Sequence, residues 1–480
     1  MNLTPSVSRR PLPALLAVSL FLGGCASFSP DGGFGSVQST VRERAGADLA
    51  WIRSDREREE VQRRVEELLS RPLSADDAVQ VALLSNRGLQ ASFEELRIAE
   101  AGMVEAGELP NPRLSLMRAS HAGTAGGREY KLEQSLTMNI FALITRPLAS
   151  EVEQRNFARA QQAVAAEVLR LAYDTRKAYY AAIAAEETAR YQRDVRDIAE
   201  AAAELARRMA GVGNFSRLAQ AREQGFYAEA ALGLARAEQA RVAARERLVR
   251  LLGLWGEQAQ LRLPDRLPAL PAAAQDLPEV EQRAMRERLD LRAVREEAQA
   301  LARNLGLTQA TRFINVLEFG PARVLEGERS GRWKNGYEVS FELPLFNWGT
   351  ARVARAEATY MQAVNRAAQL AVEARSEVRE TYQAYRTGWD LARHYRDEVV
   401  PVRKRIADEN LLRYNGMLIG VFELLADARA QVAAVNGSIE ALRDFWLAEA
   451  DLQQAMTGRP TPATFVRAST AAPAEAGAGH

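Results

Sequence analysis

Residues 337–346 read Tyr-Glu-Val-Ser-Phe-Glu-Leu-Pro-Leu-Phe, and the architecture of the chain can be predicted from this segment. From Tyr337 to Leu343 apolar and polar residues alternate, which is typical of a strand with one apolar and one polar face. Pro344 then interrupts the pattern, because proline has no backbone N–H to donate and restricts the residue before it. A helical pattern of unusual length follows. The sequence therefore predicts an amphipathic strand that leads into a long helix.

The first half of the chain carries a second copy of this arrangement. Alternating residues run from Ser135 to Ile140, and Pro147 precedes another long helical pattern. A partner strand is expected before each alternating stretch, so that the chain has four strands in two pairs. The expected partner strands and their hairpin loops are residues 113–120 with 123–127, and residues 312–319 with 326–336.

The helical patterns predict long antiparallel hairpins. At 1.5 Å per residue, the roughly sixty residues of 150–209 would span about 90 Å, and return helices are expected at 216–252 and 421–456. A capped helix with Ser74 and Asp77 at its start opens the first half and is expected to run to Gly107. The second long helix has a coiled-coil seam of Val378, Tyr382, Tyr385, Trp389, Ala392, Val399 and Val402.

Internal repetition supports two equivalent halves. Arg190, Arg193 and Asp194 recur 203 residues later as Arg393, Arg396 and Asp397 (393 − 190). Leu-Ala-Gln-Ala-Arg at 218–222 recurs 207 residues later as Leu-Ala-Asp-Ala-Arg at 425–429 (425 − 218). We expect a glycine-containing loop between these matches to absorb the difference. The repeats are assigned to residues 73–255 and 279–458, joined by a proline-rich linker at 256–278 and followed by a disordered tail at 459–480.

The N-terminus resembles a bacterial lipoprotein signal. Arg9 and Arg10 precede a short apolar run that is too short to span a bilayer, and Leu-Gly-Gly comes directly before Cys25. Residues 1–24 are therefore predicted to be removed, with a diacylglycerol and an N-acyl chain attached at Cys25. The alternative is ordinary cleavage near a chance cysteine. Residues 25–72 form an anchor and linker, whose charged stretch from Arg53 to Glu67 is either a solvated helix or a peripheral strap.

Composition and motifs argue against several classes of protein. The 63 basic and 62 acidic side chains leave a net charge of +1, which disfavours nucleic-acid binding. One cysteine and three widely separated histidines provide neither a disulfide nor a pair at metal-ligand spacing. Phosphate-binding loops, zinc-protease motifs and nucleophile elbows are absent from the sequence. We therefore expect no catalytic site, no metal and no cofactor other than the lipid.

Four alternating strands suit a membrane barrel but are too few to close one, since bacterial barrels have about eight or more. Two chains would supply eight strands and three chains twelve. The long helices would then continue from the barrel as a tube. Trp333, Tyr337 and Trp348 flank the second strand pair and are candidates for an interfacial aromatic belt, although Trp348 is equally suited to core packing.

The whole mature chain resembles the TolC-type outer-membrane efflux family. Residues 73–86 are similar to its opening helix, residues 341–346 to its strand-to-helix junction, and Tyr-Asn-Gly at 414–416 with residues 425–429 to its helix tip. The resemblance implies a mainly α fold with a β-barrel part: a homotrimer with a twelve-stranded barrel, continued by an α-helical tunnel in the periplasm. It also implies a place in the bacterial outer membrane and docking to an inner-membrane pump through a periplasmic adaptor.

The resemblance makes two helix turns the adaptor-docking tips. Both turns contain glycine, and Phe215, Met417, Leu418 and Ile419 are expected to be exposed there. The alternative is that they pack within the trimer. The residues concerned are Val212, Gly213, Asn214, Phe215 and Ser216 in the first tip, and Gly416, Met417, Leu418, Ile419 and Gly420 in the second.

Glu423 and Asp427 are candidate gate residues. They lie four apart on one helical face, and three-fold symmetry would turn them into carboxylate rings that favour cations and repel one another. The alternative is a solvated charged face. An arginine that the family often places after the tip glycine is missing, so Arg413 beside Tyr414 is the candidate replacement in a tyrosine–arginine lock.

Two other functions remain open at this point. A channel for type I protein secretion has the same architecture, and the sequence does not distinguish polypeptide cargo from small molecules or metal ions. A lipid-anchored periplasmic coiled-coil scaffold would also use long helices, but it has no need for paired amphipathic strands.

Overall fold

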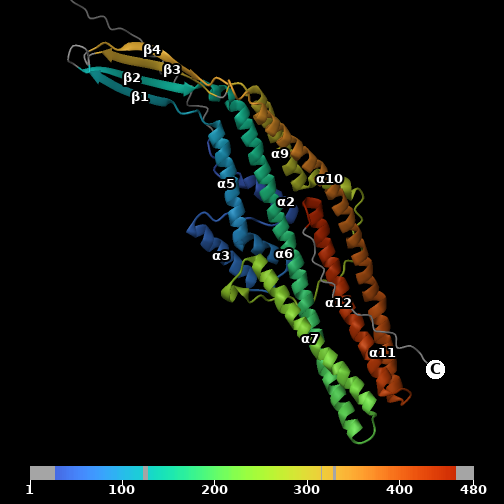
Figure 1. Cartoon of the computed structure of the whole chain (residues 1–480). Coiled ribbons are helices and arrows are strands. Elements are labelled where there is room, and N and C mark those ends of the chain that lie inside the picture. The colour runs from blue at the N-terminus through green and yellow to red at the C-terminus, as the bar shows by residue number, and fades with distance from the viewer. Residues whose placement is uncertain (1–26, 123–127, 315, 328–330, 461–480) are drawn as a thin grey trace, which may run out of the picture.

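The computed structural model describes residues 27–122, 128–314, 316–327 and 331–460. The molecule is elongated, with one sheet at one end and two long helical hairpins that extend away from it (Figure 1). Both hairpins end in tips at the opposite end of the molecule (Figure 1). The functional surfaces predicted from the sequence therefore lie at two separate ends.

The sheet has four antiparallel strands in the order β1-β2-β3-β4. The strands are β1 Arg113–Ala122, β2 Arg128–Asn139, β3 Leu317–Gly327 and β4 Lys334–Phe341. β2 pairs with β3, which joins the hairpins of the two halves into one open sheet. The predicted loop at 123–127 lies outside the described residues, and the predicted loop at 326–336 is shorter because both flanking strands extend into it.

The strand β3 begins and ends later in the chain than the predicted strand at 312–319, because it continues through Gly320 and Pro321. A Gly-Pro pair usually marks a turn. Here the strand stays paired on both sides of it, with Ala322 opposite Ser135 and Phe319 opposite Met138. A Cβ atom placed on Gly320 would lie 1.9 Å from the carbonyl oxygen of Leu136, so only glycine allows this close approach between β2 and β3.

The first hairpin consists of α6 Ile140–Gly211, with 72 residues, and α7 Arg217–Leu252. α6 begins ten residues earlier than predicted, because the Asn139 side chain caps it by accepting a hydrogen bond from the Ala142 N–H at 2.9 Å. Pro147 therefore lies inside the helix and does not precede it. At 1.5 Å per residue α6 is about 110 Å long.

The second hairpin is divided differently. It consists of α10 Thr350–His394, a π-helical turn at Tyr395–Val399, α11 Val400–Asn415 and α12 Val421–Thr457. The predicted seam is buried at Val378, Tyr385, Trp389 and Ala392. Beyond the π turn, Val402 is 47% exposed, so the seam does not continue to it.

The π turn explains the change of offset between the repeats. Before it, Arg393 follows Arg190 by 203 residues, and after it Met417 follows the equivalent Gly213 by 204 (417 − 213). A π turn holds one extra residue. The two tip loops have the same length, so the prediction that a glycine loop absorbs the slip was wrong. The 207-residue offset of the Leu-Ala-x-Ala-Arg match is therefore three residues out of structural register.

The N-terminal part packs beside the first hairpin. α2 Phe34–Ala45 is followed by α3 Asp55–Leu69, so the charged stretch is a helix with a capping box and one buried residue, Val65. The helix predicted from Ser74 to Gly107 is two helices, α4 Ala75–Ser85 and α5 Arg87–Gly107. Asn86 separates them, because its extended backbone stops α4 and its side chain accepts hydrogen bonds from the first N–H groups of α5.

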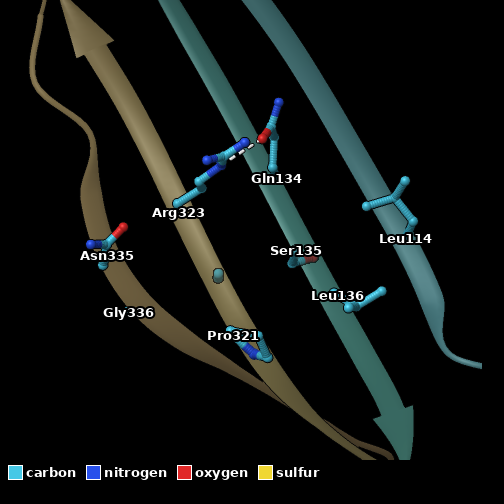
Figure 2. A pocket seen from close by; sticks show the side chains of 9 residues that line it. Leu114, Gln134, Ser135, Leu136, Pro321, Arg323, Asn335 and Gly336 are labelled. Atoms are coloured by element: carbon cyan, nitrogen blue, oxygen red, sulfur yellow. Dashed lines mark hydrogen bonds between the residues drawn. The ribbon is translucent and has the colours of Figure 1, made fainter. Parts of the chain in front are cut away.

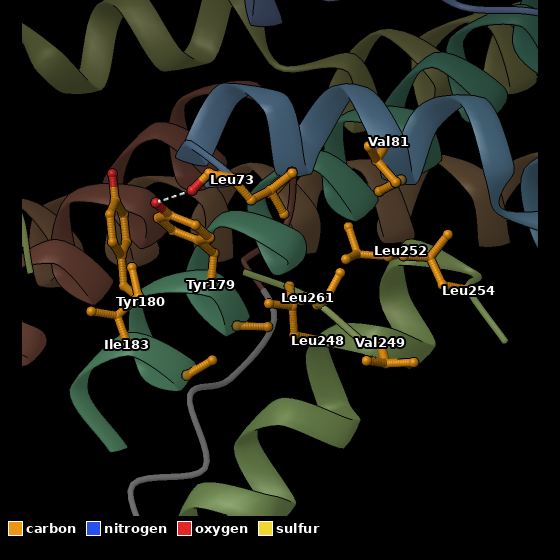
Figure 3. Packing of buried hydrophobic residues seen from close by; sticks show 14 of the residues in the cluster. Leu73, Val81, Tyr179, Tyr180, Ile183, Leu248, Val249, Leu252, Leu254 and Leu261 are labelled. Atoms are coloured by element: carbon orange, nitrogen blue, oxygen red, sulfur yellow. Dashed lines mark hydrogen bonds between the residues drawn. The ribbon is translucent and has the colours of Figure 1, made fainter. Parts of the chain in front are cut away.

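The proline-rich segment 256–278 packs against both halves of the chain. Leu261 and Leu267 are buried in the cluster of Figure 3, in which the Tyr179 hydroxyl donates to the Leu73 carbonyl oxygen at 2.8 Å. Trp446 of α12 and Trp389 of α10 donate from their indole nitrogens to the carbonyl oxygens of Pro268 and Pro271. The segment leads to α8 Val280–Glu287 and α9 Leu289–Ala310, which precede β3.

Candidate functional sites

The sheet has two chemically different faces. Because side chains alternate along a strand, the pairing register assigns every strand residue to one face or the other. One face is mainly apolar, above all at the end of the sheet nearer to the helices. It carries Leu114, Leu116, Leu136, Met138, Phe319, Tyr337, Val339 and Phe341. The other face is polar and carries Arg113, Ser115, Lys131, Glu133, Ser135, Thr137, Glu318, Glu338 and Ser340.

Ion pairs hold the polar face together. Arg113 of β1 forms an ion pair with Glu318 of β3, with 3.2 Å between Nη1 and Oε1. The hydroxyl of Thr137 on β2, between them, donates to the same carboxylate. Lys131 pairs with Glu133 and Lys334 with Glu326, each at 3.4 Å. On the apolar face, by contrast, most large side chains are exposed in the single chain, including Leu136 at 47% and Tyr337 at 75%. A sheet with one exposed apolar face requires a partner or an apolar medium.

The aromatic residues predicted for the belt are partly or largely exposed. Trp333 is 37% exposed and lies under the guanidinium group of Arg323, whose Cζ is 4.6 Å from the ring centroid. Trp348 is 58% exposed and contacts Phe313 edge-on, so in the single chain it is not a core residue. Phe346 at the strand-to-helix junction is 98% exposed.

The two helix tips are the same turn built from different residues. At the first tip the Gly213 N–H donates to the Ala210 carbonyl and the Asn214 N–H to the Met209 carbonyl. At the second tip Met417 and Leu418 donate in the same way to Tyr414 and Arg413. This pattern of bonds is a Schellman motif, which places one residue in the left-handed region. Gly213 takes that position with φ 79° and Met417 with φ 60°.

The tips expose apolar side chains, although not all of those predicted. Val212, Met417 and Leu418 are largely exposed, with Met417 at 93%. Phe215 and Ile419, which occupy equivalent positions, are half-buried, so the prediction that they are exposed was wrong. Both lie two residues before the first residue of a return helix, Arg217 of α7 and Val421 of α12. Ser216 caps α7 by accepting a hydrogen bond from the Ala219 N–H, whereas Gly420 has no side chain to cap α12; the remaining tip residues Asn214 and Gly416 are exposed.

The candidate gate residues lie within about two helical turns of the second tip. Glu423 is exposed, whereas Asp427 is half-buried and accepts a hydrogen bond from the Asn410 side-chain amide of α11. Arg413 and Tyr414 are exposed, and their carbonyl oxygens accept the two bonds of the tip turn. Asp427 of α12 therefore contacts α11, while the side chain of Glu423 is exposed to solvent.

The sequence analysis missed an ion pair that joins the two hairpins. Glu223 of α7 is 2% exposed and its Oε1 lies 3.2 Å from an Nη2 of Arg429 on α12. The Arg429 guanidinium also stacks on Phe226, with its Cζ 4.3 Å from the ring centroid. Glu223 Oε2 and Arg429 Nε are buried without hydrogen-bond partners. Arg429 belongs to the repeated Leu-Ala-x-Ala-Arg motif, but no local pattern indicates Glu223 as its partner.

Two other kinds of site are absent from the described ranges. Three or more histidine, cysteine or acidic side chains do not come together there in an arrangement suited to a metal ion. None of the helices in those ranges combines the length and apolar character needed to cross a membrane. Cys25 lies outside the described residues.

Comparison with known proteins identifies the class of fold. No protein-family profile and no curated protein sequence matches the chain. Among solved structures, it is similar to the CmeC outer membrane channel of Campylobacter jejuni, with a TM-score of 0.68, 16% identity, and coverage of 85% of this chain and 89% of CmeC. The chain therefore has the fold of the TolC-type outer-membrane efflux channels.

Two further structures agree. The outer membrane protein VceC of Vibrio cholerae matches with a TM-score of 0.66 and 16% identity over 80% of this chain and 96% of VceC. CusC, whose structures concern transmembrane channel formation, matches with a TM-score of 0.67 and 17% identity over 80% of this chain and 92% of CusC. The likeness extends over nearly the full length of each of these proteins.

Proposed function

We propose that this chain is the outer-membrane channel of a tripartite efflux system, which conducts substrates from an inner-membrane pump and a periplasmic adaptor to the exterior. The observation that supports this most directly is the open sheet. It has an apolar and a polar face, and its edge strands β1 and β4 each have one unpaired side. Unpaired edges and an exposed apolar face are both satisfied when strands from several chains close a barrel in a membrane.

Three chains would supply twelve strands, and the hairpins would line a tunnel below them. In this arrangement the polar face, with Arg113, Glu318 and Thr137, lines the lumen, and the apolar face contacts lipid. The shared fold with outer-membrane channels supports the same assembly. Cys25 would carry the lipid that anchors the N-terminus, and replacing it by serine should abolish palmitate incorporation while leaving the channel able to assemble.

The helix tips are the proposed docking surface for the adaptor. Met417 supports this role, because a non-glycine residue with positive φ costs roughly 1–2 kcal/mol, and its side chain is 93% exposed. Backbone strain at a residue whose side chain contributes little to packing within the chain is typical of functional surfaces. Val212 and Leu418 extend the apolar surface at both tips.

The second tip is also the proposed gate. Three copies of Glu423 and Asp427 would surround the narrow end of the tunnel and favour cations there. In each chain Asp427 is held by Asn410, so the position of its carboxylate depends on the α11–α12 hairpin as a unit. Movement of this hairpin would therefore change the size and charge of the opening together.

The experiment that tests the channel is the native mass of the protein extracted from outer membranes, measured by light scattering with correction for detergent. We expect a mass of three chains, and reconstitution into planar bilayers should then give discrete conductance steps. A monomer, or a dimer released without detergent, would contradict a shared barrel and favour the periplasmic scaffold.

A further inference from the structure

Charge is distributed unequally between the two faces of the sheet. All five glutamates on the four strands (Glu129, Glu133, Glu318, Glu326 and Glu338) belong to the polar face by the pairing register. The only charged residues on the apolar face of the described strands are three arginines, Arg118, Arg128 and Arg323. Among the described residues, none of these three arginines forms an ion pair with a carboxylate. The apolar face therefore carries uncompensated positive charge.

One of the three arginines, Arg128, lies at the end of the sheet farther from the helices, and the other two lie near the middle of their strands. β2 runs from Arg128 at the far end to Asn139 beside α6, and Arg118 and Arg323 lie opposite Leu132 and Gln134 near its middle. Two of the guanidinium groups are placed over aromatic rings, Arg118 over Tyr130 at 5.7 Å and Arg323 over Trp333 at 4.6 Å. Arginine on the lipid side of a barrel costs about 2–4 kcal/mol at mid-membrane and close to nothing at the interface. Arg128, at the far end of β2, therefore suits the interface, where aromatic rings also gather. Arg118 and Arg323, near the middle of the strands, are costly in lipid unless an anionic group accompanies them.

A hollow of about 320 Å³ on the same face lies beside Arg323 (Figure 2). Its end toward the helices is lined by Leu114, Leu136 and Pro321, beside the close approach of β2 and β3 at Gly320. Its other end is polar, because Arg323 donates from Nε to the Gln134 side-chain oxygen at 2.6 Å and Asn335 lies next to it (Figure 2). The hollow is therefore amphipathic along the strand direction.

We propose that Arg323 and Arg118, together with this hollow, bind a phosphorylated lipid of the outer leaflet. The phosphate contacts the guanidinium groups, which bind phosphate through paired hydrogen bonds, and an acyl chain lies over Leu114, Leu136 and Pro321. The proposal rests on the proposed function, since that places the apolar face in the membrane. The orientation agrees with an outer-leaflet lipid, because the headgroup end points away from the periplasmic helices and the acyl end points toward them.

The absence of glutamate from this face is the selective feature. A neutral interface would be served by serine, asparagine and aromatic residues alone, whereas three arginines with no acid favour an anionic headgroup over a zwitterionic one. Arg323 is also held in place by Gln134 and Trp333, so it loses less side-chain freedom on binding. The outer leaflet of an outer membrane is rich in lipid A, which carries phosphate groups on a sugar, and this is the probe that we would use.

The test compares lipid retention by native mass spectrometry of the detergent-solubilised full-length assembly. The variant Arg118→Gln with Arg323→Gln removes two cations from the apolar face, and Lys131→Gln with Lys334→Gln removes two from the polar face of the same sheet as a matched control. With bisphosphorylated lipid A, we expect roughly a thirtyfold loss of retention in the arginine variant, as for two cations that each contact an anionic headgroup, and no comparable loss in the lysine variant.

A second measurement does not depend on the folding of any variant. The unmodified protein should retain bisphosphorylated lipid A but not the same glycolipid after its phosphates are removed, and inorganic phosphate should not displace the lipid. Equal retention of both lipids, or equal retention by the arginine and lysine variants, would overturn the proposal. If the unmodified protein is not a detergent-dependent oligomer, the proposed function itself fails, which distinguishes the two failures.

Discussion

At the scale of single residues, Gly320 is the most constrained position in the sheet. Its replacement by alanine would bring a Cβ atom within 1.9 Å of the Leu136 carbonyl oxygen, so β2 and β3 must separate. We expect Gly320→Ala to destabilise the protein by about 1–3 kcal/mol, as overpacking does, and to lower the yield of assembled channel. Gly336 on β4 is the matched control, because a Cβ atom there meets nothing within 4 Å. Equal thermal stability of the two variants would refute this account.

The tips offer a reciprocal pair of substitutions. Gly213 and Met417 occupy the same left-handed position of two identical turns. We expect Met417→Gly to stabilise its tip and Gly213→Met to destabilise the other, each by about 1 kcal/mol, because only glycine adopts this conformation without strain. Hydrogen exchange of the tip amides measures both effects. If the proposed docking is correct, Met417→Gly also weakens adaptor binding despite the more stable turn, whereas unchanged binding would remove Met417 from the docking surface.

At the scale of elements, α12 contains a carboxyl group whose burial has a predictable pH effect. Desolvation by burial raises the pKa of Glu449, although the nearby positive charge of Arg176 opposes it. A raised pKa means that the folded protein binds more protons than the unfolded chain between the ordinary and the raised pKa, so the free energy of unfolding falls as pH rises through that window.

The variant Glu449→Gln removes this contribution. We expect its thermal midpoint to exceed that of the unmodified protein at pH 7, and the difference to shrink as the pH is lowered toward 4. Glu440→Gln, at an exposed position on the same helix, is the control and should follow the unmodified protein. A gap between Glu449→Gln and the unmodified protein that widens at low pH would contradict the assigned sign.

Elements with a strong local period could be predicted from the sequence, and elements decided by a few contacts could not. β2, β4 and the long hairpins follow from alternation and from helical spacing. The break at Asn86, by contrast, depends on one cap, and the position of β3 depends on a close approach at Gly320. The π turn at Tyr395–Val399 adds one residue to a continuous helix, and hydrophobic spacing does not reveal it.

The same distinction applies to the candidate sites. The tip loops were located by their glycines, but their shared geometry emerges only from the backbone bonds, in which methionine replaces glycine. The faces of the sheet follow from alternation, whereas the segregation of arginine from glutamate needs the register between strands far apart in sequence. The bond between Glu223 and Arg429 spans 206 residues and has no local signature.

At the scale of the whole molecule, the Glu223–Arg429 pair connects the hairpin of the first repeat to that of the second. If the second hairpin forms the gate, outward movement of α12 must break this pair and the packing of Val432 against the buried cluster of Val195, Ala199 and Ala230 in the first hairpin. The pair is only partly satisfied, since Glu223 Oε2 and Arg429 Nε are buried without partners. Separating two helices that are joined by such a pair costs less free energy than separating two helices joined by a fully hydrogen-bonded pair.

We therefore expect Arg429→Gln to increase the basal conductance of the reconstituted channel, because it weakens the hold of the first hairpin on the second. Glu223→Gln should act in the same direction, and the exchange of both charges, Glu223→Arg with Arg429→Glu, should restore part of the closed state if the pair acts as a contact. Arg443→Gln is the control on the same helix, since Arg443 pairs with its neighbour Asp444 within α12. Basal conductance that is equal in the Arg429 and Arg443 variants would show that the two hairpins are held together by packing and not by this ion pair.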